Sequence, residues 1–253
     1  MTFPHYKHKH KEEALPDPIK AVKYSQSQGR MPKSVPKNII ICYSGTLFNK
    51  IIKKYKVKKT IFYRPFYILK TPKGEIGILG NFGIGAPVTA MYLEELIVLG
   101  AKNIIAIGYA GALQKKLAPG NVVVCDKAIR DEGTSHHYLK PSKFTYSSKA
   151  LTKKIEKTLQ KNCISYCKGS TWTTDAPYRE TYTEIKQYKK EGVITVEMEA
   201  SALFAVASIR KVNAATAFII SDILGEKWDI KYHMARKQLE MLFDIAKEAL
   251  LNN

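Results

Sequence analysis

Two glutamates bracket a methionine at residues 197–199, where an apolar run meets a helical pattern that begins at Ala200. A carboxylate at the N-terminus of a helix is stabilised in its ionised form by the positive end of the helix dipole. Ionised carboxylates accept hydrogen bonds from hydroxyl groups, and a thioether packs well on an apolar ring face. Glu197, Met198 and Glu199 are therefore candidates to bind a sugar. The structural alternative is that the glutamates only supply the negative charge common in a first helical turn.

Glycines and a further acidic residue follow other apolar runs along the chain. In an α/β sheet, ligands bind outside the carboxyl ends of the strands, and glycines there let the backbone approach a ligand closely. The segments at the ends of the expected strands are Ser44-Gly45, Gly83-Ile84-Gly85, Gly108-Tyr109-Ala110-Gly111, Glu197-Met198-Glu199 and Ser221-Asp222. Their shared position predicts one site at one edge of the sheet.

The segments that must position these residues alternate between strand and helix patterns. Apolar runs that predict buried strands lie at 38–43, 75–79, 103–107, 121–125, 192–196 and 214–220, and an aromatic-rich strand is expected within 60–70. Helical periodicity covers 47–55, 87–99, 148–160, 181–190, 200–210 and 232–251. Such alternation predicts an α/β fold in the form of a three-layer sandwich. No repeat or linker marks a second domain, so we expect an extended N-terminal arm over 1–37 and a single domain over 38–253.

The bulk composition narrows the class of protein. With 253 residues and 45% hydrophobic content, the chain can bury a large core. The net charge of +19 is compatible with nucleic-acid binding. The lysines are scattered over amphipathic segments, however, and no RNA-binding aromatic signature or zinc finger is present, so we expect no nucleic-acid partner. An anionic substrate would still be attracted.

No apolar run reaches membrane-spanning length and the N-terminus is polar, which predicts a cytoplasmic protein without a membrane partner. The four cysteines have neither redox nor zinc spacing, so we expect reduced thiols. His136 and His137 lie near acidic residues, but adjacent strand residues point to opposite faces, so we expect no metal and no cofactor.

Taken in order, the motifs resemble the nucleoside phosphorylase family, which includes purine nucleoside phosphorylase, uridine phosphorylase and the methylthioadenosine nucleosidases. The resemblance runs from about residue 38 to the C-terminal helix and implies a mixed, partly barrel-like central sheet flanked by helices. It also implies cleavage of the N-glycosidic bond of a nucleoside. The motifs that carry it are Gly83-Ile84-Gly85-Ala86-Pro87, Ile107-Gly108-Tyr109-Ala110-Gly111-Ala112-Leu113, Pro119-Gly120-Asn121-Val122-Val123-Val124, Val196-Glu197-Met198-Glu199-Ala200 and Ser221-Asp222.

The resemblance implies two catalytic carboxyl groups. Residues 197–199 match the segment that holds the ribose, and Glu199 would stabilise positive charge that develops on the sugar mainly in the transition state. Asp222 matches the acid that hydrogen-bonds or protonates N7 of a departing purine, and with Ser221 it favours a purine over uracil. The alternative for Asp222 is an ordinary strand-terminal cap.

Further contacts follow from the same resemblance. Arg64 is placed like an arginine that reaches across a subunit interface to phosphate, which implies a homodimer or a hexamer; the alternative is an ordinary surface arginine. His5 is placed like an N-terminal histidine that reaches a neighbour's ribose 5′-hydroxyl, and the alternative is a disordered polar tail.

The base is expected to contact Gly111, Ser221 and Asp222 together with a loop around residues 172–180. In this loop the family commonly has an aromatic residue where Pro177 stands here. Trp172 or Tyr178 would then stack on the base, and Arg179 would bind a base carbonyl or phosphate. The alternative is a plain turn at 175–178.

The expected phosphate site, made by Gly45, Arg64 and Tyr109, departs from the family pattern. Asn49 and Ala106 stand where phosphorylases have arginines, and Tyr109 replaces a Ser or Thr. At about 1.5 to 3 kcal/mol per charge-assisted hydrogen bond, two lost arginines would weaken phosphate binding by orders of magnitude.

The hydrolytic relatives carry a glutamate after the first strand, which is also missing here. Because Arg64 and the segments at 83–87 and 119–124 resemble phosphorylases more than hydrolases, phosphorolysis with inorganic phosphate as co-substrate is the leading prediction. Hydrolysis by water and a catalytically weak nucleoside-binding protein are the alternatives.

Overall fold

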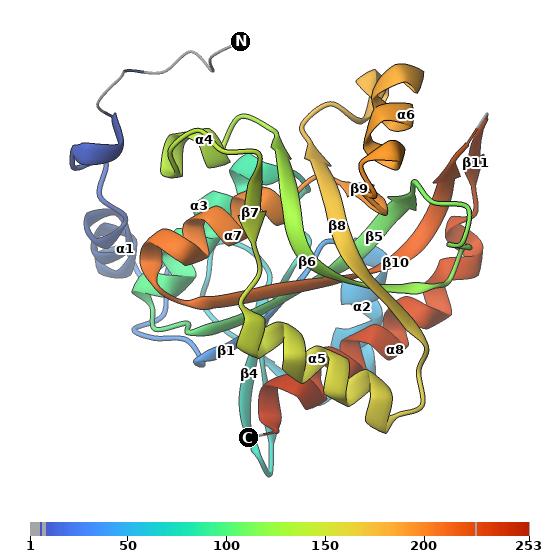
Figure 1. Cartoon of the computed structure of the whole chain (residues 1–253). Helices are drawn as coiled ribbons and strands as arrows, with labels where there is room; N and C mark the ends of the chain where they lie inside the picture. Colours follow the sequence, from blue (N-terminus) through green and yellow to red (C-terminus); the bar gives the residue numbers. More distant parts are fainter. Residues whose placement is uncertain (1–5, 7–8, 226, 253) are drawn as a thin grey trace.

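A computed structural model describes residues 6, 9–225 and 227–252. Over these residues one eleven-stranded mixed sheet forms the centre, in the order β11-β10-β6-β8-β9-β5-β1-β4-β3-β2 with β7 beside β6 (Figure 1). The strands are β1 (Asn38–Cys42), β2 (Val57–Lys59), β3 (Phe66–Thr71), β4 (Gly74–Gly80), β5 (Asn103–Ala112), β6 (Val122–Asp131), β7 (Phe144–Tyr146), β8 (Tyr166–Thr174), β9 (Thr195–Glu197), β10 (Asn213–Leu224) and β11 (Trp228–Ile230).

Part of this sheet closes into a barrel. Strand β10 pairs with β5 as well as with β6, so the run β10-β6-β8-β9-β5 returns to β10. Strand β5 makes this possible because its first half pairs with β1, from Asn103 to Ile107, whereas Gly111 and Ala112 pair with β9. The predicted α/β fold with a mixed, partly barrel-like sheet is thereby confirmed.

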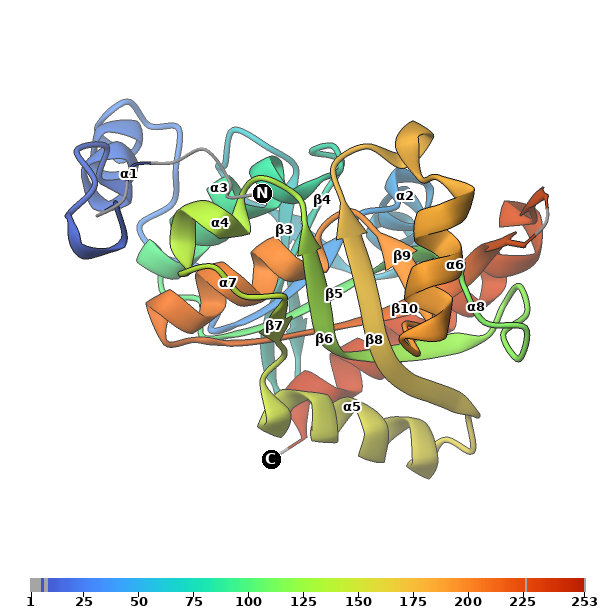
Figure 2. The same ribbon diagram turned by 45° about the horizontal axis from the view of Figure 1, so that its top comes forward.

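Helices cover both faces of the sheet, as Figures 1 and 2 show. One core cluster joins the sheet to α3 and α7, and a second joins its other face to α2, α5 and α8. None of the described helices is long and apolar enough to cross a membrane. The helices and 3-10 turns are η1 (Lys9–Lys11), α1 (Pro18–Ser27), α2 (Gly45–Lys54), α3 (Ala86–Val98), α4 (Ser135–Tyr138), α5 (Lys149–Lys161), η2 (Pro177–Arg179), α6 (Tyr182–Lys190), α7 (Ala200–Arg210) and α8 (Tyr232–Leu251).

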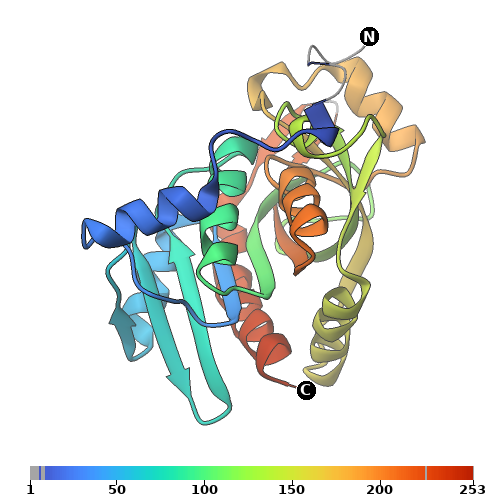
Figure 3. The ribbon, with the colours of Figure 1, turned by 90° about the vertical axis from the view of Figure 1, so that its left-hand side faces the viewer.

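The N-terminal segment is not extended throughout, which corrects the expected arm over 1–37. Asp17 caps α1 by accepting a hydrogen bond from the Ile19 amide at 2.8 Å, and Pro18 occupies the first turn. Val22, Met31 and Val35 are buried in the core cluster around α3. Figure 3 shows α1 beside α3, so residues 18–35 pack on the domain.

Strand β8 is the main element that hydrophobic patterning did not predict. Its buried positions include Thr171 and Thr173, which alternate along the strand and are polar. The expected strand at 60–70 begins only at Phe66. The expected strands at 103–107, 121–125 and 214–220 continue further at their carboxyl ends, whereas the one at 192–196 is shorter, β9. Polar residues such as Lys127 and Asp222 therefore obscured the ends of β6 and β10, and Gly108 and Gly111 obscured the end of β5.

Candidate active site

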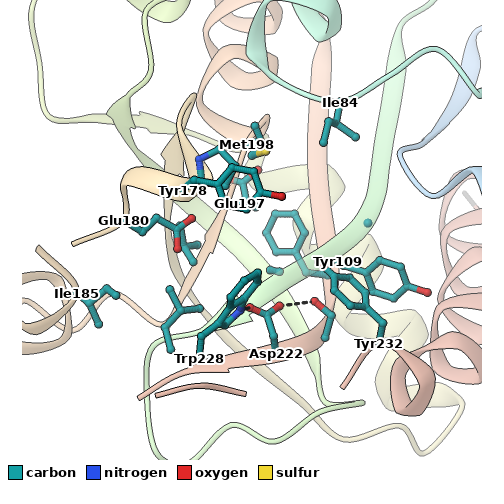
Figure 4. Close-up of a pocket in the computed structure, with 18 of the residues that line it drawn as sticks. Ile84, Tyr109, Tyr178, Glu180, Ile185, Glu197, Met198, Asp222, Trp228 and Tyr232 are labelled. Carbon is teal, nitrogen blue, oxygen red and sulfur yellow. Dashed lines mark hydrogen bonds between the residues drawn. The ribbon is translucent and has the colours of Figure 1, made fainter. Parts of the chain in front are cut away.

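A cavity of about 630 Å³ opens at the carboxyl ends of β5 and β10, beside β9 (Figure 4). Figure 4 shows Glu197 and Met198 on one side of the cavity and Asp222 and Trp228 on the other. The expected strand-end residues do converge here, and the residues that line the cavity are Tyr43, Ser44, Ile84, Gly108, Tyr109, Ala110, Gly111, Pro177, Tyr178, Glu180, Tyr182, Ile185, Val196, Glu197, Met198, Glu199, Phe218, Ser221, Asp222, Leu224, Gly225, Lys227, Trp228 and Tyr232.

Glu197 is held by a network of donors at the N-terminus of α7. Its Oε2 accepts hydrogen bonds from the amides of Glu199 and Ala200 at 2.8 and 2.7 Å. Its Oε1 accepts one from the hydroxyl of Thr173 at 2.6 Å, and this hydroxyl accepts one from the Ser201 amide at 3.1 Å. Glu197 therefore satisfies the first free amides of α7 and fixes the chain before it.

Glu199 is held by the glycine turn that precedes α3. The Gly85 amide donates a hydrogen bond to Oε1 of Glu199 at 2.6 Å. Gly85 has a φ of 105°, which favours glycine, and it is the N-cap of α3. The turn thus directs the positive end of this helix at the catalytic candidate. Fewer donors reach Glu199 than Glu197, which leaves Glu199 the carboxylate available to a ligand.

Burial raises the pKa of both glutamates, and the two groups interact. For Glu197 the hydrogen bonds from Thr173, Glu199 and Ala200 oppose this rise, because they stabilise the ionised form. For Glu199 the negative charge of Glu197 raises the pKa further. Because Glu197 has more donors, the structure favours an ionised Glu197 beside a Glu199 that takes up a proton more readily.

Asp222 reaches the cavity through an irregularity in β10. The register with β5 shifts between Ile220 and Asp222, so consecutive Ser221 and Asp222 both line the cavity. The Ser221 hydroxyl donates to Oδ1 of Asp222 at 2.6 Å, and the Trp228 indole donates to Oδ2 at 2.7 Å. Asp222 therefore has a hydrogen bond on each oxygen.

Gly111 supplies the close approach that this arrangement needs. A Cβ at Gly111 would lie 2.4 Å from Cδ1 of Leu224 and 3.1 Å from Oδ2 of Asp222. Any larger residue would displace the Asp222 side of the cavity. The lack of a side chain at Gly111 therefore leaves room for Leu224 and for Asp222, the predicted base contact.

A different set of residues lies where phosphate was expected. Ser44, the N-cap of α2, and Tyr109 line the cavity, and their hydroxyl groups interact. The Tyr109 ring also meets Tyr232 edge-on at 5.4 Å. Among the described lining residues Lys227 is the only lysine or arginine, and it lies beside Trp228 rather than beside Ser44. We call the region around Ser44 and Tyr109 the acceptor end.

Several predicted contacts lie outside the cavity lining. Trp172 is buried in another core cluster, where its indole donates to Asp131 at 2.8 Å, so its assignment to the base is corrected to a structural role. Arg179 is exposed and does not line the cavity. Ala106 is buried in the core, and His5 lies outside the described residues.

The two other phosphate candidates also lie outside the lining. Gly45 follows Ser44 at the start of α2, and its Cβ position is blocked by Asn81 at 2.4 Å. Arg64 is exposed in the loop before β3, where its Nε donates to the Tyr92 hydroxyl at 2.6 Å. Neither residue contributes to the cavity of its own chain.

Of the acidic residues that line the cavity, the sequence predicted Glu197, Glu199 and Asp222 but not Glu180. Glu180 follows η2 and points into the cavity between Tyr178 and Trp228 (Figure 4). It immediately precedes Thr181, which caps α6 in a capping box with Glu184, and this signature could have placed Glu180 at the end of the loop that faces the base.

Comparisons with known proteins show which chains this one is similar to. An uncharacterized protein R802 from Acanthamoeba polyphaga mimivirus is 33% identical over 149 residues, 57% of each chain. A purine nucleoside phosphorylase DeoD-type from Exiguobacterium sp. is 31% identical over 61% of this chain and 66% of its own. The chain thus spans 57 to 66% of the length of these two relatives.

A solved structure covers more of the chain. Uridine phosphorylase from Vibrio fischeri superposes with a TM-score of 0.75 and 27% identity over 90% of this chain and 98% of its own. The family model described as the phosphorylase superfamily matches residues 37–249. Because this match includes every strand and every lining residue of the cavity, the chain belongs to the phosphorylase superfamily.

Proposed function

We propose that this protein cleaves the N-glycosidic bond of a purine nucleoside by phosphorolysis, releasing the base and ribose 1-phosphate. The observation that carries this proposal is the placement of Asp222 and Glu199 in one cavity, with Glu197 and Met198 on the opposite side from Asp222. Glu199 would accept hydrogen bonds from ribose hydroxyls, and Asp222 would hydrogen-bond the departing purine. The reaction requires no cofactor in this proposal, only inorganic phosphate as co-substrate.

Met198 and the aromatic side chains define where the two halves of the nucleoside would lie. Met198 lines the cavity beside Glu197, in reach of the sugar. Tyr178 is exposed and lies on the side of Glu197 and Met198, whereas Trp228 lies beside Asp222, so the two rings could face the base from different sides. Asp222 and the similarity to the purine nucleoside phosphorylase from Exiguobacterium support a purine as the base. The similar solved structure from Vibrio fischeri is a uridine phosphorylase, so the fold alone does not distinguish the two bases.

Phosphate binding in this proposal depends on a second copy of the chain. Because Arg64 is exposed and lies outside its own cavity, it would bind phosphate only in a neighbour's cavity. We therefore include a homodimer, or a hexamer built from dimers, in the proposed function, and we place the reaction in the cytoplasm.

Hydrolysis by water is a second candidate, and one observation favours it. The acceptor end holds the hydroxyl groups of Ser44 and Tyr109, whereas Lys227 lines the cavity beside Trp228 and Arg236, whose charge acts on Tyr109, does not line it. Hydroxyl groups alone suit an uncharged acceptor such as water better than a phosphate dianion.

One assay separates these activities. The purified protein is incubated with inosine, guanosine, adenosine or uridine, with and without phosphate, and the released base is measured. Phosphate-dependent release of a purine is the expected result. Release that ignores phosphate would establish the hydrolase instead, release from uridine alone would refute the purine assignment, and no release would indicate a nucleoside-binding protein.

A further inference from the structure

Glu180 presents an unpartnered carboxyl group to the side of the cavity that holds Asp222. Within the described part of the chain, no residue donates a hydrogen bond to it or forms an ion pair with it. Asp222 differs, because Ser221 and Trp228 each donate to one of its oxygens. A half-buried carboxyl group without donors is poorly stabilised, and a ligand that brings donors would relieve this cost.

We propose that Glu180 selects the base by accepting hydrogen bonds from its N–H edge, so that the cavity prefers guanine, which presents two adjacent N–H donors, over adenine. Selection by Glu180 rests on the cavity being the nucleoside site proposed above. The preference follows from hydrogen-bond geometry. The two oxygens of an ionised carboxylate match the parallel N1–H and 2-amino donors of guanine. Adenine presents one amino donor beside the acceptor N1, and an ionised carboxylate would repel that acceptor.

The charged surroundings of Glu180 make this preference depend on pH. Burial, together with the negative charges of Asp222 and Glu184, raises the pKa of Glu180 to about 7. Lys227 also lines the cavity, as do the phenols of Tyr178 and Tyr232.

A protonated Glu180 offers one donor and one acceptor, which match the N1 and amino group of adenine. Guanosine affinity should therefore rise as pH increases through neutrality, whereas adenosine affinity should fall.

The test compares binding of guanosine, inosine and adenosine by titration calorimetry, from about pH 6 to about pH 8.5, in the wild type and in Glu180→Gln. At the alkaline end the wild type should bind guanosine about 10- to 100-fold more tightly than adenosine, with inosine between them. The side-chain amide of the substituted glutamine presents an amino donor and a carbonyl acceptor at every pH. In Glu180→Gln we therefore expect adenosine to bind at least as tightly as guanosine, without the opposed pH slopes.

Glu184→Gln is the matched control. Glu184 contributes negative charge near Glu180, but its carboxylate is bonded to Thr181 and does not line the cavity. Glutamine is also accepted at this position of a capping box, so the fold should persist. Glu184→Gln should retain the preference for guanosine.

An unchanged guanosine-to-adenosine ratio in Glu180→Gln, or an equal loss of preference in Glu184→Gln, would overturn the assignment. Failure of the proposed function looks different. If guanosine binds selectively but no base is released, the catalytic proposal fails and the role of Glu180 stands; if no nucleoside binds to the wild type, both fail.

Discussion

The end of the cavity that holds Glu197, Met198 and Glu199, where we propose that ribose binds (the ribose end), differs from the acceptor end in how its polar groups are held. At the ribose end, main-chain amides and Thr173 fix Glu197, and the Gly85 amide holds Glu199, within a buried region. At the acceptor end, Ser44 and Tyr109 offer hydroxyl groups, and the charge of Arg236, which does not line the cavity, acts on Tyr109. The end of the cavity that we propose for the sugar is thus built from buried groups of one chain, whereas, among the described residues, no lysine or arginine lines the cavity beside Ser44 and Tyr109.

The largest effect should come from Glu199→Gln, which tests the ribose end directly. The substitution keeps the shape but removes the carboxyl group that, in its ionised form, would stabilise the developing cation on the sugar. We expect turnover to fall about 100- to 1000-fold, with a smaller change in KM, because the interaction strengthens in the transition state. Steady-state kinetics with the best nucleoside measures this. Glu191→Gln, on the surface beside Lys143, is the control; a full rate in Glu199→Gln would remove Glu199 from the mechanism.

Arg64→Ala tests whether the acceptor end is completed from outside the chain. We expect KM for phosphate to rise about 10- to 100-fold while the nucleoside KM changes little, because a charge-assisted contact to phosphate is lost. Arg64 also donates to Tyr92, so Tyr92→Phe controls for loss of that contact.

Coexpression separates a contact within one chain from a contact between chains. When Arg64→Ala and Glu199→Gln chains assemble together, one cavity of each mixed dimer has both native residues, so the purified mixed dimer should have roughly half of the activity of the wild-type dimer. Mixed dimers without activity would show that Arg64 does not serve a neighbour's cavity.

Much of the fold follows from sequence pattern, and the exceptions share a physical cause. Apolar runs and helical periodicity identified the strands and helices that pack against the core, because burial of apolar side chains determines both. Strand β8 was missed because its buried Thr171 and Thr173 are polar and are satisfied by tertiary contacts, as with Thr173 and Glu197. Helix α1 was missed because only Val22 of its residues is buried.

The site was predicted best where side chains follow strands. The positions of Glu199, Ser221 and Asp222 follow from strand ends, and all three line the cavity. Trp172 was misassigned because sequence places it next to the base loop without showing which face of β8 it occupies. Glu180 was missed because its importance lies in the absence of a partner among the described residues, which only three-dimensional contacts reveal.

Thr173→Val tests how far the order of the ribose end depends on one hydroxyl group. The valine keeps the shape but leaves Oε1 of Glu197 without its shortest donor and the Ser201 amide without its acceptor. We expect the free energy of unfolding to fall by about 1 to 3 kcal/mol, with turnover reduced about 10-fold. Urea unfolding and steady-state kinetics measure the two effects. Thr183→Val, at an exposed position of α6, should change neither; equal effects in both variants would show that the hydroxyl network does not order the site.

The smallest effect should be a change in how stability depends on pH. Because burial raises the pKa of Glu199 above its ordinary value of 4.5, the folded state binds more protons than the unfolded state between these two values. Stability attributable to Glu199 is therefore present below about pH 4.5 and is lost as pH rises through the raised pKa.

Glu199→Gln removes this loss, so its free energy of unfolding should decline less with rising pH than that of the wild type, by at most about 1.4 kcal/mol per pH unit. Urea titrations without nucleoside provide the measurement. The pKa of Glu191 is lowered by Lys143, so Glu191→Gln should leave the slope above about pH 4.5 unchanged and should change it in the opposite sense only below that pH. If the free energy of unfolding of Glu199→Gln depends on pH as that of the wild type does, ionisation of Glu199 does not reduce stability. The ribose end and the acceptor end would then differ only in the geometry of their polar groups.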